Sequence, residues 1–182
     1  ANYAKSFVAA VDGLKAEHGV FGVLGNHEHW TDEVDRVVQV QRDAGITMLL
    51  NQSVPIAVGN TLWWLCGVDD VWEKKADLER TLAKVPDEHF RILLCHEPDY
   101  ADTAAQRGIP LQLSGHSHGG QVRLPGVGPI RLPIYALRYP YVLQRVPRTG
   151  TTVYTTAGVG VTFPPIRINC RPEVGILRLA RG

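Results

Sequence analysis

The chain has 182 residues, 45% of them apolar and 20% charged, which is enough to bury one core and predicts a single domain over residues 1–182. No stretch approaches the roughly 18 consecutive apolar residues of a membrane span. Three widely spaced cysteines do not make a disulfide scaffold, so we expect buried thiols and a cytoplasmic location. The net charge of +1 hides an asymmetry, because residues 1–120 carry 10 basic and 17 acidic side chains, whereas residues 121–182 carry 9 arginines, no lysine and one acid, Glu173.

Taken in chain order, the first 45 residues predict a helix, a strand and a second helix. Apolar side chains at positions 3, 7, 11 and 14 share one helical stripe that ends near Gly19, and the short apolar run 20–24 then predicts a strand. Thr31 is placed to cap a second helix, whose apolar positions include Val34 and Val38 and which Gly45 ends.

The rest of the chain predicts mostly strands, with one short helix over 77–84. Strands are expected over 46–50, 54–58, 61–68, 90–95, 111–113, 121–124, 152–156 and 174–179, with Gly59-Asn60 as a tight-hairpin signal. Early alternation of helix and strand, followed by an excess of strands, favours an α/β layered fold with a largely parallel core and antiparallel edges. In such folds the loops after the carboxyl ends of strands carry the chemistry.

Three short segments place polar side chains directly after apolar runs. They are Gly25-Asn26-His27-Glu28, Cys95-His96-Glu97 and Gly115-His116-Ser117-His118, and five of the seven histidines fall in or beside them. Imidazole and amide-oxygen ligands suit Zn²⁺, Mn²⁺ or Fe²⁺, whereas an all-oxygen set would suit Mg²⁺ or Ca²⁺. His116 and His118 are two residues apart and can approach one ion or two neighbouring ions. The pattern therefore predicts a site for a divalent transition metal.

These segments resemble three signature motifs of the calcineurin-like metallophosphoesterases. The similarity extends to Gly67-Val68-Asp69-Asp70, Gly119-Gly120-Gln121, Leu124-Pro125-Gly126, Gly158-Val159-Gly160, Pro165-Ile166-Arg167 and Pro172-Glu173, as in the small bacterial phosphodiesterase branch. The resemblance implies a layered metallophosphoesterase-like β-sandwich flanked by helices. It also implies metal-dependent hydrolysis of phosphate esters, with phosphodiesters as the expected substrates, by a metal-activated water.

The same resemblance assigns roles to individual residues. It makes Asn26, His96 and His116 ligands of one metal, His118 a ligand of its neighbour, and His27 the catalytic acid or charge stabiliser. Such a division of labour is chemically sensible, because a metal-bound water loses its proton near neutral pH and a protonated imidazole can neutralise the leaving oxygen.

One part of the family pattern is missing from this sequence. Family members begin with a strand ending in Asp-x-His and a second ending in Gly-Asp, and neither motif is present. We therefore expect an N-terminally truncated domain without its first βαβ portion, holding one ion tightly rather than two. Exposed strand edges would favour a homo-oligomer in which two copies pair or exchange strands. The alternative function is a catalytically silent remnant that binds metal or phosphate, or an interaction domain.

Further residues have two readings each. His29 and Arg167 are predicted to contact substrate, although a salt bridge to Glu173 explains Arg167 equally well, and Asp70 is a minor candidate ligand. Glu28 and Glu97 either orient imidazoles or are solvated loop acids. The arginine-rich end suits phosphate contacts or an anionic surface, or else pairs with the acidic part of the chain. No specific nucleic-acid partner is predicted, and membrane association is expected only through segments outside this sequence.

Overall fold

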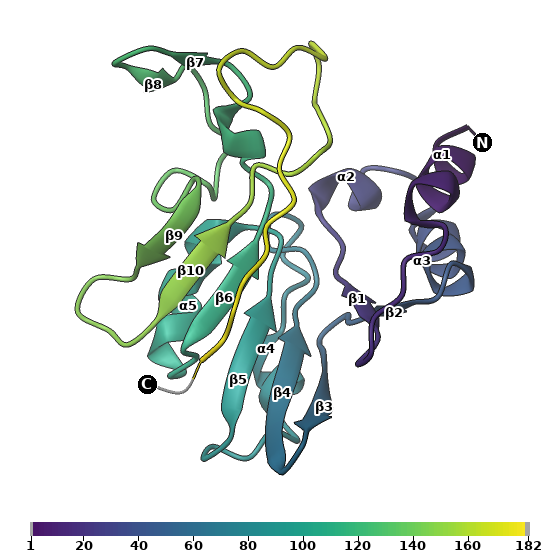
Figure 1. The fold of residues 1–182 in the computed structure, drawn as a ribbon, viewed down its shortest axis with the longest axis vertical. Coiled ribbons are helices and arrows are strands. Elements are labelled where there is room, and N and C mark those ends of the chain that lie inside the picture. Colours follow the sequence, from purple (N-terminus) through teal and green to yellow (C-terminus); the bar gives the residue numbers. More distant parts are fainter. Residues whose placement is uncertain (1, 181–182) are drawn as a thin grey trace.

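The fold is organised around a six-stranded mixed sheet with the strand order β3-β4-β5-β6-β10-β9 (Figure 1). The computed structural model describes residues 2–180. The strands of this sheet are β3 (Gln52–Val58), β4 (Thr61–Gly67), β5 (Phe90–Leu94), β6 (Leu111–Ser114), β9 (Val142–Arg145) and β10 (Thr152–Thr155). Strands β4, β5, β6 and β10 run parallel, and β3 and β9 are antiparallel edges.

Smaller elements surround the sheet. Two short pairs form separate two-stranded sheets, β1 (Val20–Gly22) with β2 (Ile46–Met48) and β7 (Arg123–Leu124) with β8 (Gly128–Pro129). The helices are α1 (Asn2–Val11), α2 (Asn26–His29), α3 (Val34–Asp43), α4 (Leu78–Leu82) and α5 (Ala101–Gln106), with single 3₁₀ turns η1 (Pro98–Tyr100) and η2 (His118–Gly120).

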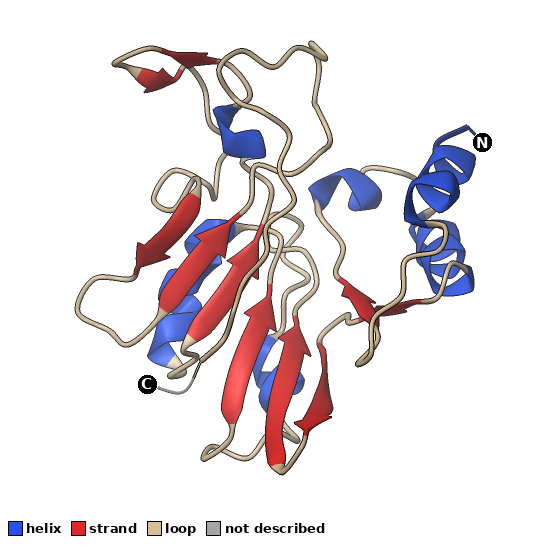
Figure 2. Cartoon of the chain, viewed as in Figure 1, coloured by secondary structure: helices blue, strands red, loops and turns tan. Residues whose placement is uncertain are grey.

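The six-stranded sheet is covered on both faces, which explains the nearly continuous apolar sequence of its central strands. On one face Leu65 and Ile92 pack with Phe21 from β1. On the other face Cys66 and Leu93 pack against apolar side chains of α4 and α5. Figure 2 shows the resulting arrangement, with the sheet between these helices and the β1–β2 pair.

The predicted α/β layered fold is confirmed in its main features, including the parallel core, the antiparallel edges and the β3–β4 hairpin at Gly59-Asn60. The strand predicted over 174–179 is wrong, because these residues have no regular structure and no backbone hydrogen bond to a neighbouring strand within residues 2–180. Apolar alternation alone cannot make a strand without a ladder partner. Neither α5 nor β9 was expected from the sequence. Among the described residues no helix is long and apolar enough to cross a bilayer.

Candidate metal centre

The three predicted motifs meet at the carboxyl ends of parallel strands. Asn26 opens α2 shortly after β1, His96 follows β5, and His116 follows β6. The ring centroids of His96 and His116 are 4.8 Å apart. One ligand atom from each of His96, Glu97 and His116 lies within 4.8 Å of the others. Residues 20 to 90 positions apart in sequence are thus joined in one cluster, because each follows the carboxyl end of a strand.

Gly25 is the residue that lets the first motif approach His96. A Cβ atom built on Gly25 would lie 2.6 Å from Nε2 of His96, so only a glycine fits against this imidazole. The backbone of Gly25 is extended, with φ of −122°, and its N–H donates to the Glu28 carboxylate at 2.9 Å. Space, rather than backbone conformation, therefore requires glycine here.

Asn26 brings an unsatisfied oxygen to the same place. Its side chain is 2% exposed, and its Oδ1 atom has no hydrogen-bond partner among the described residues. A buried acceptor without a donor is unusual in a folded protein and calls for an explanation. A cation beside it would satisfy the lone pairs.

The orientation of His116 is set by its backbone and by one hydrogen bond. The residue has a φ of 64°, in the left-handed region that non-glycine residues rarely adopt. Its Nε2 atom lies 2.8 Å from the carbonyl oxygen of Ile134. Because a carbonyl can only accept, Nε2 carries the proton, and the Nδ1 lone pair is left free to bind a ligand.

The surroundings of the histidines keep them neutral. Burial, together with the smaller effects of the nearby imidazoles of His116, His118 and His27, lowers the pKa of His96 to about 3. Burial is also the main cause that lowers the pKa of His116 and of His118. Neutral imidazoles are the form that binds metals. His116, His118 and His27 therefore lie near enough to His96 to affect its pKa.

Two buried carboxyl groups lie beneath this cluster. Glu97 and Asp70 are both 0% exposed. Burial and a hydrogen bond to Asp70 raise the pKa of Glu97 to about 8. One oxygen of each, Oε1 of Glu97 and Oδ2 of Asp70, has no partner among the described residues. Burial and the neighbouring Asp70 therefore favour the protonated form of the Glu97 carboxyl group.

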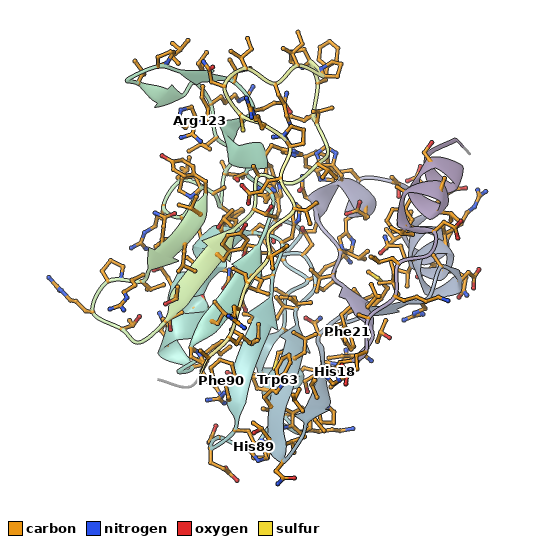
Figure 3. All side chains as sticks on the ribbon, in the orientation of Figure 1. His18, Phe21, Trp63, His89, Phe90 and Arg123 are labelled. Atoms are coloured by element: carbon orange, nitrogen blue, oxygen red, sulfur yellow. The ribbon has the colours of Figure 1, made fainter. Side chains whose placement is uncertain are left out.

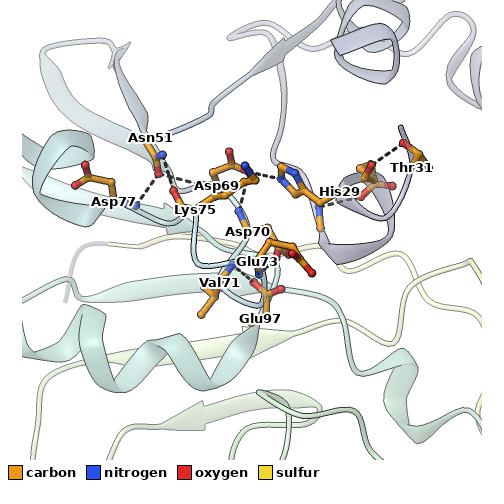
Figure 4. Close-up of polar contacts among 12 residues, drawn as sticks. His29, Thr31, Asn51, Asp69, Asp70, Val71, Glu73, Lys75, Asp77 and Glu97 are labelled. Atoms are coloured by element: carbon orange, nitrogen blue, oxygen red, sulfur yellow. Dashed lines mark hydrogen bonds and ion pairs between the residues drawn. The ribbon is translucent and has the colours of Figure 1, made fainter. Parts of the chain in front are cut away.

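A hydrogen-bonded network fixes the loop that carries Asp70 (Figure 4). The Asn51 side chain accepts from the backbone N–H of Asp69 at 3.0 Å and of Asp77 at 2.8 Å, and donates to the carbonyl of Lys75 at 2.9 Å. His29 Nε2 lies 2.7 Å from Asp69 Oδ1, with the His29 side chain 5% exposed. His29 therefore links α2 to the end of β4, and the substrate contact predicted for it stays a prediction.

Arg167 reaches the same edge of the sheet from the C-terminal part of the chain. Its guanidinium donates to the backbone carbonyls of His118, Ala157, Gly158 and Gly160. The suggested salt bridge to Glu173 does not form among the described residues, because Glu173 accepts from the Tyr154 hydroxyl instead. Arg167 thus joins the His118 turn to the loop that follows β10, and its predicted phosphate contact is untested.

A strip of aromatic rings borders the cluster, and its members Trp72 and Tyr135 were not predicted. The Trp72 ring makes edge contacts with His116, Trp30 and Tyr135, at centroid distances of 5.7, 5.4 and 6.1 Å. His27, which is exposed, packs against Trp30 at 4.8 Å. The Trp30 indole is held by a 2.9 Å hydrogen bond to Glu73. The candidate centre therefore has an apolar, partly exposed wall on one side.

The structure thus brings together the predicted residues Asn26, His27, His96, His116 and His118. Glu97 approaches the ligand atoms, whereas the sequence predicted for it either an imidazole-orienting role or a solvated position. Trp72 follows Asp69-Asp70 closely, but nothing else in the sequence indicated a role for it. His18 and His89, the two histidines outside the motifs, lie away from this cluster near the lower edge in Figure 3. His89 accepts a 3.1 Å hydrogen bond from the Trp64 indole.

The residues present fit a divalent cation. Neutral imidazoles, an unpartnered amide oxygen and unpartnered carboxyl oxygens face a common region, and this mixed nitrogen and oxygen set is the kind that Mn²⁺, Fe²⁺ and Zn²⁺ accept.

Comparisons with known proteins agree with this chemistry. No protein-family model and no solved structure matches the chain. The chain is 35% identical over 169 residues to the uncharacterized metallophosphoesterase YkuE of Bacillus subtilis, an alignment that spans 91% of the chain and 58% of the relative. It is also 35% identical over 162 residues to phosphodiesterase YaeI of Escherichia coli, spanning 87% of the chain and 57% of the relative.

A third relative, an uncharacterized metallophosphoesterase of Helicobacter pylori strain J99, is 31% identical over 182 residues, spanning 96% of the chain and 46% of the relative. The chain therefore spans about half the length of the relatives it matches, and those matches extend over nearly all of the chain. Together with the three motifs and the cluster that they form, these similarities show that the chain belongs to the metallophosphoesterase family.

Proposed function

We propose that this chain carries out metal-dependent hydrolysis of phosphodiesters. The observation that supports this most directly is the convergence of Asn26, His96 and His116 around unpartnered buried acceptors. The similarity to phosphodiesterase YaeI supports the reaction class. When bound, a divalent transition metal supplies a Lewis acid that polarises the phosphate and activates a water molecule for attack.

The residues of the chain have separate tasks in this proposal. Asn26, His96 and His116 hold the ion, and the hydrogen bond from His116 Nε2 to the Ile134 carbonyl orients that ring. Glu97, whose backbone adjoins His96, provides a further oxygen beside the imidazoles. His118 offers an imidazole to a neighbouring position in this proposal.

His27 is proposed as the proton donor to the leaving alcohol. Its ring is exposed and lies against Trp30, so it can reach a substrate that approaches from solvent. A cationic imidazole at this point would offset the charge that develops on the leaving oxygen. The alcohol part of the substrate would then lie along the aromatic strip of Trp30, Trp72 and Tyr135.

The test is hydrolysis of bis(p-nitrophenyl) phosphate with added Mn²⁺, Fe²⁺ or Zn²⁺. We expect turnover that falls at least about a hundredfold in His116→Ala, whereas His18→Ala, a matched change at an exposed histidine, leaves the rate unchanged. Absence of turnover with every ion, in chain that binds metal, would favour the alternative of a silent metal-binding domain. Isothermal titration with each ion establishes whether the chain binds that ion.

We also propose that the chain forms a homo-oligomer. Val174 and Ile176 are 81% and 95% exposed in a segment that has no ladder partner among residues 2–180. Apolar side chains on an unpaired extended segment favour pairing with a second copy. Light scattering tests this, and a monodisperse monomer would contradict it.

A further inference from the structure

Two loops at the upper edge of the molecule expose large apolar side chains (Figures 1 and 3). The first is the β7–β8 hairpin, residues 122–131, and the second is the loop 158–168 that follows β10. We call six of their exposed apolar residues the apolar crown: Leu124, Val127, Ile130, Val161, Phe163 and Ile166. Phe163 is 92% exposed and Val127 is 76% exposed. Side chains of this size are rarely left so open at loop tips without a binding role.

The crown is held by the fold rather than by its own packing. The Gln121 side chain donates to the carbonyls of Thr162 and Pro164 at 3.1 and 2.7 Å, and accepts from the Thr162 N–H at 2.8 Å. Arg123 N–H donates to the Ile168 carbonyl at 3.0 Å, which joins the hairpin to the loop. Arg167 fastens the start of the loop to the His118 turn. The apolar tips are therefore presented on a fixed support.

The charge around the crown has one sign. Residues 122–131 and 158–171 contain Arg123, Arg131, Arg167 and Arg171 and no acidic residue. Of the arginines in the described part of 121–182, Arg138 alone forms an ion pair, with Asp102. The alternative reading of the sequence, in which these arginines pair with the acidic part of the chain, therefore does not hold near the crown.

We propose that the apolar crown docks onto the surface of an anionic phospholipid bilayer. Protruding apolar tips enter the boundary between headgroups and acyl chains, while the guanidinium groups of Arg123, Arg131 and Arg171 bind lipid phosphates. A second copy of the chain is a poorer fit, because its own crown carries the same positive charge and would repel it. This inference goes beyond the proposed function, and it places a membrane contact inside a sequence where none was expected.

Docking in this way has a geometric consequence. The loop 158–168 begins beside His118, whose carbonyl accepts from Arg167. A bilayer against the crown would therefore lie on the His118 side of the candidate metal centre.

The experiment is sedimentation of the metal-free chain with vesicles of phosphatidylcholine, with and without phosphatidylglycerol. We expect partition onto the anionic vesicles to be at least about tenfold stronger than onto neutral ones and to weaken with added salt. Phe163→Asp lowers this partition about tenfold or more, because it removes the most exposed apolar side chain of the crown and adds a repelled charge. Val127→Asp, on the other loop, has the same effect and guards against a folding defect in either variant.

Matched controls lie at the other end of the sheet. Phe90 is 44% exposed at the start of β5, near the lower edge in Figure 3, and Phe90→Asp leaves partition unchanged. Arg171→Ser weakens binding, whereas Arg148→Ser, in the turn between β9 and β10, does not.

Three results would overturn the proposal. One is equal sedimentation with neutral and anionic vesicles, or none with either. A second is equal loss of binding in Phe90→Asp and Phe163→Asp. The third is a lipid-free assembly that Phe163→Asp disperses, which would assign the crown to contacts between copies. Because neither metal nor substrate is present, none of these results bears on the proposed hydrolysis.

Discussion

Substituting Gly25 by alanine tests whether His96 lies where the ion is held. The added methyl carbon would lie 2.6 Å from Nε2 of His96 and 2.7 Å from two other ring atoms. Ordinary contact begins at 3.4 Å, so the imidazole must move by about 0.8 Å. The extended backbone of Gly25, with φ of −122°, accepts alanine without strain. The perturbation is therefore confined to the position of one ring.

The available direction of movement determines the size of the effect. The His116 ring lies 4.8 Å away on another side of His96, so His96 shifts toward a neighbouring proposed ligand or tilts its lone pair away from it. Displacements of about 1 Å in a reacting site lower rates by roughly a hundredfold, and disturbed ligand orientation lowers metal affinity 10- to 100-fold. We expect Gly25→Ala to bind Mn²⁺ about 10- to 100-fold more weakly, with a free energy of unfolding within about 1 kcal/mol of the unmodified chain.

Isothermal titration with Mn²⁺ measures this, alongside urea unfolding of the metal-free chain. Gly150→Ala is the matched control, since a Cβ at Gly150 meets no atom within 4 Å and its φ is not in the left-handed region. Unchanged metal affinity in Gly25→Ala, with folding intact, would refute the assignment of His96 as a ligand.

Three further predictions concern the surroundings of the site. Asp99→Ala removes a carboxylate that accepts from the N–H groups of Leu137, Arg138 and Tyr139 at 2.9 to 3.1 Å, and urea unfolding should show a loss of about 2 kcal/mol, partly restored by Asp99→Asn. Trp72→Ala should raise KM for an aryl phosphodiester about tenfold with little change in kcat, and the reverse pattern in steady-state kinetics would assign Trp72 to the chemical step instead. Burial raises the pKa of the Cys66 thiol to about 11, so the thiol ionises at lower pH in the unfolded chain than in the folded one. The free energy of unfolding should therefore fall as pH rises from about 9 to 11, and it should fall less steeply in Cys66→Ala.

The sequence predicts the sheet well because its strands are specified locally. Residues 65–67 of β4 and 91–93 of β5 are buried, and the apolar runs that contain them indicate strands covered on both faces. Residues 174–179 alternate in the same way but find no partner strand among the described residues, so the local signal was correct and the tertiary requirement was not met. The short helix α5, with sequence Ala-Asp-Thr-Ala-Ala-Gln, has too few apolar positions to show a periodicity.

The candidate site was likewise predictable from the sequence only in part. The convergence of Asn26, His96 and His116 follows from their shared position after strand ends, which motif spacing reveals. Trp72 and Tyr135 lie on loops whose paths depend on distant hydrogen bonds. Asn51 accepts from the N–H groups of residues 69 and 77, and Asp99 accepts from those of residues 137 and 138. No periodicity encodes such contacts, so the aromatic strip could be recognised only in three dimensions.

The backbone of the third motif indicates why these histidines are placed as they are. His116, His118 and Gln121 have φ values of 64°, 50° and 49°, and each left-handed non-glycine residue costs roughly 1–2 kcal/mol. Glycines at these positions would remove that cost. They would also remove the His116 and His118 side chains from the cluster and the Gln121 side chain that holds the crown. Hydrogen bonds from His116 to Ile134, from Arg167 to His118 and from Gln121 to Thr162 and Pro164 offset the strain. A turn that keeps strained side chains through such compensation is better explained by what those side chains bind than by the stability of the fold.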